Sequence, residues 1–128
     1  MAAPSPTAVV VIAHGSRREA ANEDVRWMAR QLAEHTDYAP IEVAYLELAA
    51  PDIATAAAAC VARGASHVLL LPYFLSAGTH VVDDLRRCCT ELSAAFPRVR
   101  FELCPPLGLH PLMLHIVRDR LQERLPSI

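Results

Sequence analysis

The chain has 128 residues, a formal net charge of −2, 53% hydrophobic residues and 20% charged residues. This balance predicts a globular protein with one domain over residues 1–128, and it excludes an intrinsically disordered chain. The small negative charge excludes a general attraction to nucleic acid, so we expect no nucleic-acid partner.

The N-terminal segment and the cysteines bear on the location of the protein. Residues 1–7 hold no Lys or Arg and are expected to be flexible, and the apolar run Ala8–Ala13 is too short for a signal-peptide core or a membrane span. The four cysteines form no C-x-x-C pair and are expected to be reduced thiols. We therefore expect a cytoplasmic protein without a membrane partner.

The first predicted strand is the run Ala8–Ala13, which is rich in β-branched residues, as is typical of a central parallel strand buried on both faces. It ends at His14, where Gly15 lets the backbone turn tightly. Ser16 is expected to cap the next helix, which runs over Arg17–His35.

A second strand and a second helix follow. The run Ile41–Leu46 predicts the strand. Pro51 and Asp52 then open the helix, because proline is well tolerated at a first helical position, and the helix continues to Arg63 before Gly64 stops it. The alanine-rich face of this helix is expected to pack close to a sheet.

The last part of the chain repeats the alternation twice. Val68–Leu71 predicts a third strand, and after a loop Thr79 is expected to cap a helix that ends at Phe96. Val99–Leu103 predicts a short fourth strand, and His110–Leu125 predicts a last helix.

This order of elements predicts an α/β fold with a flavodoxin-like arrangement. Right-handed crossovers turn alternating strands and helices into an open, four-stranded parallel sheet in the order 2-1-3-4, with helices on both faces. The strand order then changes direction between the first and third strands, and ligands bind at such a switch point, outside the carboxyl ends of the strands.

Three residues with metal-binding side chains, His14, Glu47 and His80, each follow or lie near the end of an apolar run. Glu47 lies 33 residues after His14, and His80 lies 33 residues after Glu47. A strand and its crossover helix take roughly 30 residues or more, so this period places the three along one sheet edge. Two imidazoles and a carboxylate suit Fe²⁺, Co²⁺, Ni²⁺ or Zn²⁺. The pattern predicts a site that handles one of these metals.

Each of these residues also has a structural explanation. His14 is also explained as a histidine bonded to a nearby carbonyl, Glu47 as a surface carboxylate at a strand end, and His80 as a helix cap. Arg17 and Arg18 suit a ligand with several carboxylates, because guanidinium pairs with carboxylate in a bidentate way, but exposed arginines are ordinary in a first helical turn. The sequence lacks the common nucleotide, zinc-protease and nucleophile-elbow motifs.

Four segments together resemble the small class II chelatases, which insert a divalent metal into sirohydrochlorin in cobalamin or siroheme synthesis. The segments are Val9–Arg17 (VVVIAHGSR), Ala44–Ile53 (AYLELAAPDI), Leu71–Leu85 (LPYFLSAGTHVVDDL) and Pro105–Pro111 (PPLGLHP). In that family the histidines of the first and third segments bind the metal, which carries over to His14 and His80. The family's glutamate carries over to Glu47.

The resemblance implies a metal chelatase of the lyase class, either a sirohydrochlorin cobaltochelatase or a ferrochelatase. Its substrates would be sirohydrochlorin and Co²⁺, Fe²⁺ or Ni²⁺, with no further cofactor. A flat macrocycle with several carboxylates needs a broad apolar cleft with cationic edges, and the candidates for its lining are Arg17, Arg18, Tyr73, Phe74, Leu75, Leu107 and Leu109. The resemblance also implies a homodimer, with the last helix as one candidate for the contact.

Two alternatives stay open. The same histidines would serve a non-catalytic carrier of metal or tetrapyrrole, which turnover with free macrocycle would distinguish from an enzyme. A flavodoxin-like partner-binding domain is the other alternative, although the segment from Gly15 to Arg18 is a poor phosphate cradle.

Overall fold

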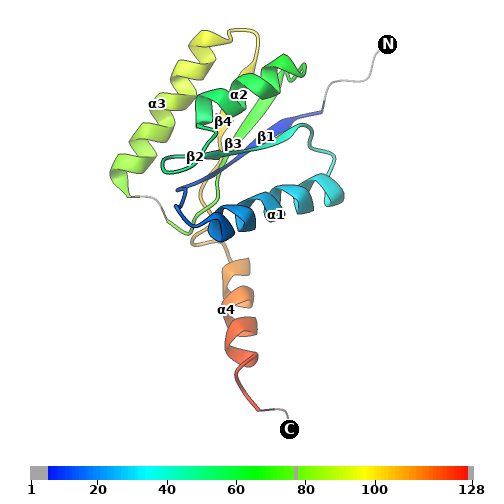
Figure 1. Cartoon of the computed structure of the whole chain (residues 1–128), viewed down its shortest axis with the longest axis vertical. Coiled ribbons are helices and arrows are strands. Elements are labelled where there is room, and N and C mark those ends of the chain that lie inside the picture. The colour runs from blue at the N-terminus through cyan, green and yellow to red at the C-terminus, as the bar shows by residue number, and fades with distance from the viewer. Residues whose placement is uncertain (1–5, 77, 127–128) are drawn as a thin grey trace.

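The computed structural model describes residues 6–76 and 78–126 as four strands and four helices that alternate along the chain (Figure 1). The strands are β1 (Ala8–Ala13), β2 (Ile41–Tyr45), β3 (His67–Pro72) and β4 (Arg100–Leu103). The helices are α1 (Glu19–His35), α2 (Ile53–Ala62), α3 (Thr79–Ala95) and α4 (Leu112–Gln122). The predicted α/β alternation is confirmed.

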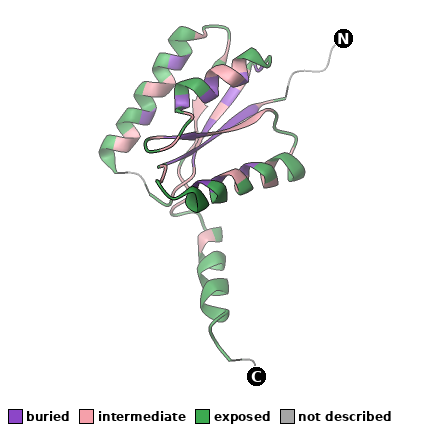
Figure 2. Cartoon of the chain, in the orientation of Figure 1, coloured by how far each residue is buried: buried purple, intermediate pink, exposed green. Residues whose placement is uncertain are grey.

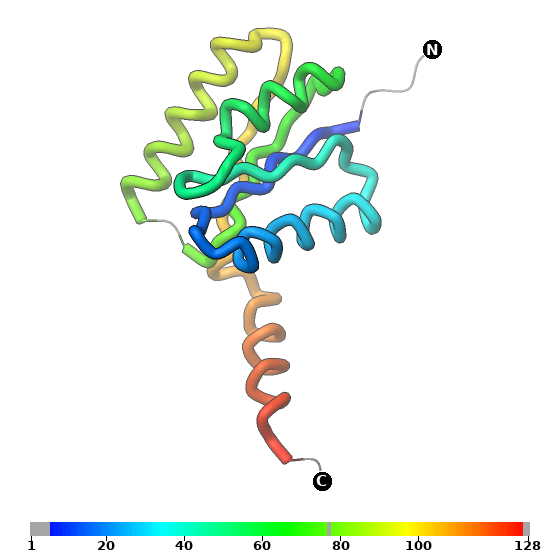
Figure 3. Tube along the Cα trace, viewed as in Figure 1, coloured from blue at the N-terminus to red at the C-terminus, as the bar shows by residue number. Residues whose placement is uncertain are grey.

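The four strands form one parallel sheet in the order β2-β1-β3-β4, as predicted. β1 is thus paired with both β2 and β3, and the tube trace shows the path of the chain through these strands and the helices between them (Figure 3). All six residues of β1 are buried, which is what its β-branched sequence predicts for a strand covered on both faces. The reversal of strand order therefore lies beside the end of β1, where His14 begins the next loop.

Helices cover both faces of the sheet, with α1 on one side and α2 and α3 on the other (Figure 1). Val10 and Ile12 of β1 point toward α2 and α3, whereas Val9 and Val11 point toward α1. Small side chains bring α2 close to the sheet: its Ala57 is completely buried. The expectation of a closely packed, alanine-rich helix is confirmed.

The beginnings of all four helices differ from the predictions. Helix α1 starts at Glu19 with Arg18 at its cap position, so Ser16 is not the cap. Helix α2 starts at Ile53, after Asp52, whose carboxylate accepts a hydrogen bond from the Thr55 N–H at 2.8 Å. This bond satisfies one of the first helix N–H groups, which have no partner within the helix.

Helix α3 also begins differently, because Gly78 occupies its cap position and Thr79 is its first residue, with no side-chain capping bond. Both ends of β1 and the last residue of α1 agree with the predictions, and the ends that differ do so by one to three residues: β2 ends at Tyr45, and α4 spans only Leu112–Gln122. The exact first and last residues of an element depend on local hydrogen bonds, which the hydrophobic periodicity of the sequence does not predict.

Helix α4 points away from the rest of the molecule (Figure 1), and none of its residues is buried (Figure 2). It is therefore not one of the helices that cover the sheet. None of the helices among residues 6–76 and 78–126 has the length and apolar content needed to cross a membrane.

The segment expected to be flexible, residues 1–7, falls mostly outside the described residues, which begin at Pro6. The Thr7 carbonyl accepts a hydrogen bond from the Ala39 N–H at 3.1 Å, so Thr7 is tied to the residues that precede β2.

Candidate metal centre

The backbone holds His14 and Glu47 beside each other at the carboxyl edge of the sheet. The pairing of β1 with β2 continues past both strands, because the Leu46 N–H donates to the Ala13 carbonyl at 2.9 Å and the Glu47 N–H donates to the His14 carbonyl at 3.1 Å. The side chains of His14 and Glu47 are both exposed. The predicted adjacency of these two residues therefore has a physical basis in the parallel ladder.

Gly15 is required for this close approach. Its φ of +92° lies in the region that side chains other than glycine rarely adopt, and a Cβ built on it would lie 1.8 Å from the Glu47 carbonyl oxygen. Leu48, which follows Glu47 in the chain, has a φ of 66°, a backbone conformation that is strained for a residue with a side chain. Backbone strain of this kind is concentrated at functional sites.

Substituting Gly15→Ala is expected to lower the free energy of unfolding by more than the roughly 1–2 kcal/mol that the left-handed backbone alone costs. The added methyl group must also displace the Glu47 carbonyl. Gly64→Ala is a matched control, because Gly64 has a φ of +94° but open space around a Cβ. Urea denaturation of both variants measures the difference, and equal losses of stability would show that the contact with Glu47 has no energetic role.

The His14 ring packs against Phe74, with the ring centroids 4.5 Å apart and the planes tilted by 31°. Phe74 belongs to the loop after β3, and the preceding N–H, of Tyr73, donates to the Ile12 carbonyl at 2.7 Å. The β3 loop is thus tied to β1, and Phe74 supports one side of the imidazole. Phe74, a predicted macrocycle-lining residue, is thus in contact with a predicted metal ligand.

His80 lies exposed in the first turn of α3, which a loop connects to β3. Within residues 6–76 and 78–126, no group of three His, Cys, Asp or Glu side chains lies close enough to hold a metal ion. The structure therefore brings His14 and Glu47 together through the backbone, and it does not assemble the predicted set of His14, Glu47 and His80. That three-residue metal site stays a prediction.

Arginine side chains near the site divide into paired and unpaired groups. Arg26 of α1 donates to Glu19 and Glu23, and Arg30 also donates to Glu23, at 2.7 Å. These hydrogen bonds from Arg26 and Arg30 hold the pKa of Glu23 below its usual value.

Arg17 and Arg18 follow His14, are exposed, and form no ion pair with the part of the chain that is described. They are the cations beside His14 that remain available to a ligand.

An apolar pocket of about 590 Å³ opens between α1, the end of β3 and the start of α4. It is lined by Met28, Leu32, Leu71, Tyr73, Cys104, Pro105, Pro106, Leu107, His110, Leu112, Met113 and Ile116. Two predicted macrocycle-lining residues, Tyr73 and Leu107, are among them, whereas Arg17, Arg18, Phe74, Leu75 and Leu109 are not. The lining includes none of His14, Glu47 and His80 and no Arg or Lys. An apolar group suits this pocket better than a ligand with several carboxylates.

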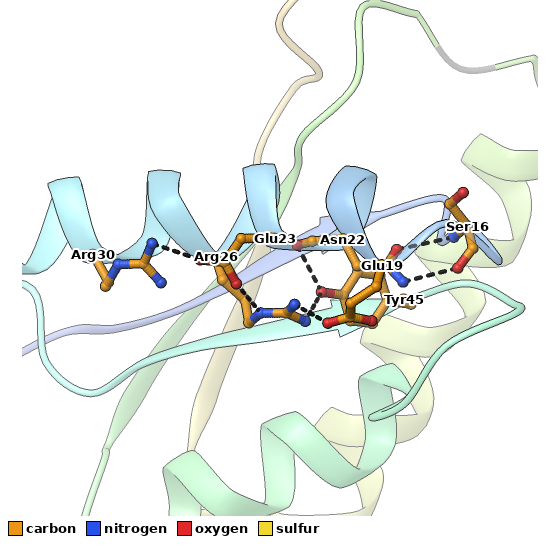
Figure 4. A network of polar contacts seen from close by, with 7 residues as sticks. All are labelled: Ser16, Glu19, Asn22, Glu23, Arg26, Arg30 and Tyr45. Carbon is orange, nitrogen blue, oxygen red and sulfur yellow. Dashed lines mark hydrogen bonds and ion pairs between the residues drawn. The ribbon is translucent and has the colours of Figure 1, made fainter.

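One residue close to the site was not among the sequence predictions. Asn22 of α1 is 4% exposed, and its side chain is hydrogen-bonded to Ser16, two residues after His14 (Figure 4). The burial of Asn22 could have been predicted from the sequence, because its spacing places it on the same helical face as Val25, Ala29 and Leu32. A polar residue on a core-facing stripe has to find a partner, and here that partner is the loop after β1.

The chain matches a known protein family and is similar in sequence to named relatives. The protein-family model CbiX matches residues 8–124. The sirohydrochlorin ferrochelatase of Arabidopsis thaliana, a chloroplastic protein, is 33% identical over 120 residues, which make up 94% of this chain and 53% of the relative.

Two crystal structures are also similar. A CbiX protein from Marinobacter aquaeolei VT8 superposes with a TM-score of 0.79 and 28% identity, over 92% of this chain and 96% of that one. The sirohydrochlorin chelatase SirB from Bacillus subtilis subspecies spizizenii, in complex with cobalt, superposes with a TM-score of 0.85 and 25% identity, over 94% of this chain and 51% of SirB. The chain thus spans about half the length of the Arabidopsis and Bacillus proteins. Because the CbiX model matches nearly its whole length, the chain belongs to the CbiX family of class II chelatases.

Proposed function

We propose that the protein is a sirohydrochlorin chelatase, a lyase-class enzyme that inserts Co²⁺ or Fe²⁺, with Ni²⁺ as a third candidate, for cobalamin or siroheme biosynthesis. The observation that carries this proposal is the match of the CbiX family model to residues 8–124. Relatives named as ferrochelatase and cobaltochelatase, and a relative crystallised with cobalt, support it. In this account the metal is a substrate.

The reaction exchanges two pyrrole N–H protons of the macrocycle for one divalent metal ion. We assign His14 and His80 to hold the incoming ion, because a neutral imidazole suits all three candidate metals. Glu47 lies next to His14 and presents an exposed carboxylate, so we assign it to bind the ion or to accept a pyrrole proton. Arg17 and Arg18 are assigned to the macrocycle carboxylates, since both are exposed after His14.

An anaerobic absorbance assay tests the function. Purified protein is mixed with sirohydrochlorin and, separately, with Co²⁺, Fe²⁺ or Ni²⁺, and the rate of insertion is compared with the uncatalysed rate. The proposal predicts a clear acceleration for at least one metal. A protein that binds the metal stoichiometrically without accelerating insertion would contradict the proposal and would instead be a carrier.

We further propose that the protein works as a homodimer in which α4 makes part of the contact. The chain covers 51% of SirB, so a second copy would supply an equivalent of the remaining half. In α4, the side chains of Leu112, Leu114, Ile116, Val117 and Leu121 are between 49% and 66% exposed. The pocket at the base of α4 is mostly apolar and is lined by no Arg or Lys, so it suits aliphatic side chains from a partner's α4.

Substituting Leu121→Glu is expected to convert the dimer into a monomer without unfolding the protein. Leu121 is 66% exposed, so a charge there leaves the core unchanged but would be buried without a partner in the dimer. Light scattering coupled to size-exclusion chromatography gives the mass, and Gln122→Glu, one residue further along the same helix, is the control. A monomeric wild-type protein, or a Leu121→Glu variant that remains dimeric, would contradict the proposed contact.

A cytoplasmic location is also part of the proposal. All four cysteines are free thiols, and burial raises the pKa of the Cys60 thiol to about 11. Free thiols are typical of reducing compartments, which supports this location.

A further inference from the structure

Asn22 is the one buried polar residue in the described part of the chain, and both polar atoms of its side chain bind the same residue. Its Oδ1 accepts a hydrogen bond from the Ser16 N–H at 3.0 Å, and its Nδ2 donates to the Ser16 carbonyl at 2.8 Å (Figure 4). The two bonds fix the orientation of the amide, because the Ser16 N–H can only donate. The Asn22 side chain therefore forms two hydrogen bonds with the backbone of the loop that begins with His14.

The start of the loop is held by the bond from the Glu47 N–H to the His14 carbonyl and by the packing of His14 on Phe74, whereas the part after Gly15 depends on other contacts. Helix α1 begins at Glu19 without a side-chain cap, and the Ser16 hydroxyl is used locally, accepting from the Arg18 N–H at 3.0 Å. Between His14 and Ser16, the loop turns through Gly15 at a φ of +92°. A loop that turns through a glycine has many accessible conformations, and the two hydrogen bonds from Asn22 to Ser16 restrict them.

The same turn of α1 is also bonded to the end of β2. The Tyr45 hydroxyl donates to the Asn22 carbonyl at 3.2 Å, and Arg26 donates to this hydroxyl at 3.3 Å (Figure 4). Tyr45 is 2% exposed and stands two residues before Glu47. One residue of α1 thus contacts both chain segments that carry the exposed His14 and Glu47 side chains.

We propose that Asn22 is a positioning residue for the metal site: through Ser16 and Tyr45 it holds the His14 loop in register with Glu47. This inference rests on the proposed function only in taking His14 and Glu47 as metal-binding residues. Groups behind metal ligands fix the orientation of the ligands, and their loss typically reduces metal affinity or activity about 10- to 100-fold. An equivalent effect is expected here, although Asn22 acts through the backbone of the loop.

The test compares three variants in a titration of the purified protein with Co²⁺ alone, followed by absorbance, at a temperature well below every melting temperature. Asn22→Ala removes both bonds to Ser16, and its Co²⁺ affinity is expected to fall about 10- to 100-fold. Asn22→Asp keeps an acceptor for the Ser16 N–H and is expected to recover part of the affinity. Val25→Ala is the matched control, since Val25 is buried on the same face of α1, 7% exposed, and has no bond to the loop.

A purely structural role for Asn22 would give a different pattern. Asn22→Ala and Val25→Ala would then both lower the melting temperature and both leave the Co²⁺ affinity of the folded protein unchanged, which would overturn the inference. A wild-type protein that binds no Co²⁺ would also overturn it. The outcome is separate from that of the proposed function, because wild-type protein that binds Co²⁺ without accelerating insertion would refute the enzyme and leave the role of Asn22 standing.

Discussion

Replacing either His14 or His80 with alanine is expected to reduce the rate of metal insertion to the uncatalysed rate while the protein stays folded. Both side chains are exposed and neither belongs to the buried clusters on the two faces of the sheet, so the core does not depend on them. A metal ion that loses one of two imidazole ligands is neither bound tightly nor held while it sheds water. Anaerobic insertion assays and thermal unfolding of each variant measure the two effects separately.

His35→Ala is the control for these substitutions, because His35 is exposed in the last turn of α1, away from the carboxyl edge of the sheet. Its insertion rate is expected to equal that of the wild-type protein. Full activity in His14→Ala or His80→Ala would remove that histidine from the metal site. Loss of folding in either variant would show that the side chain has a structural role that its exposure does not reveal.

The second large effect is expected for Glu47→Gln, which keeps the size and shape of the side chain and removes its charge and basicity. If Glu47 accepts a pyrrole proton, the insertion rate should fall by about 10²- to 10⁴-fold, the usual contribution of a general base. The measurement is the insertion rate at saturating metal, together with the Co²⁺ affinity in the absence of macrocycle. Glu34→Gln, at an exposed position of α1, is the control.

The two readouts separate the two roles proposed for Glu47. A lower rate with unchanged Co²⁺ affinity identifies a base, whereas a lower affinity identifies a metal ligand. A variant with the wild-type rate and affinity would show that Glu47 is a surface carboxylate at a strand end.

The architecture was predictable because its signals are repeated along the chain. The β-branched run Ala8–Ala13 indicated a strand covered on both faces, and all six of its residues are buried. Alternation of strands and helices with right-handed crossovers leaves few topologies, and the observed order β2-β1-β3-β4 is the predicted one. The position of α4 was not predictable in this way, because an apolar pattern shows that a helix face will be covered and does not show which chain covers it.

Helix starts were less predictable, because their hydrogen bonds depend on tertiary contacts. Ser16 has the right residue type for a cap, yet its backbone is bonded to Asn22, six residues further along the chain. Asp52 is an ordinary cap whose signal was present in the sequence, and the preference of proline for a first helical position placed the start of α2 too early.

The candidate site was predictable where strands determine it and less so where loops do. Parallel pairing of β1 with β2 places His14 beside Glu47, whereas His80 follows a loop whose path no periodic pattern determines. Tyr73 and Phe74 were both assigned to the macrocycle cleft, but Tyr73 lines the apolar pocket and Phe74 packs against His14. Tyr73 packs with the buried cluster on the α1 face of the sheet and Phe74 with the cluster on the other face, so the two neighbours lie on opposite sides.

The most direct test of the metal site is a crystal structure of the protein with Co²⁺, in which anomalous scattering locates the ion. We expect one cobalt ion at the carboxyl edge of the sheet, bound by His14 and His80 with Glu47 beside it. The competing location is the pair His67 and Glu102, whose Nε2 and Oε2 atoms are 2.8 Å apart, with His67 at the start of β3. Cobalt at that pair, with none at His14, would contradict the central claim.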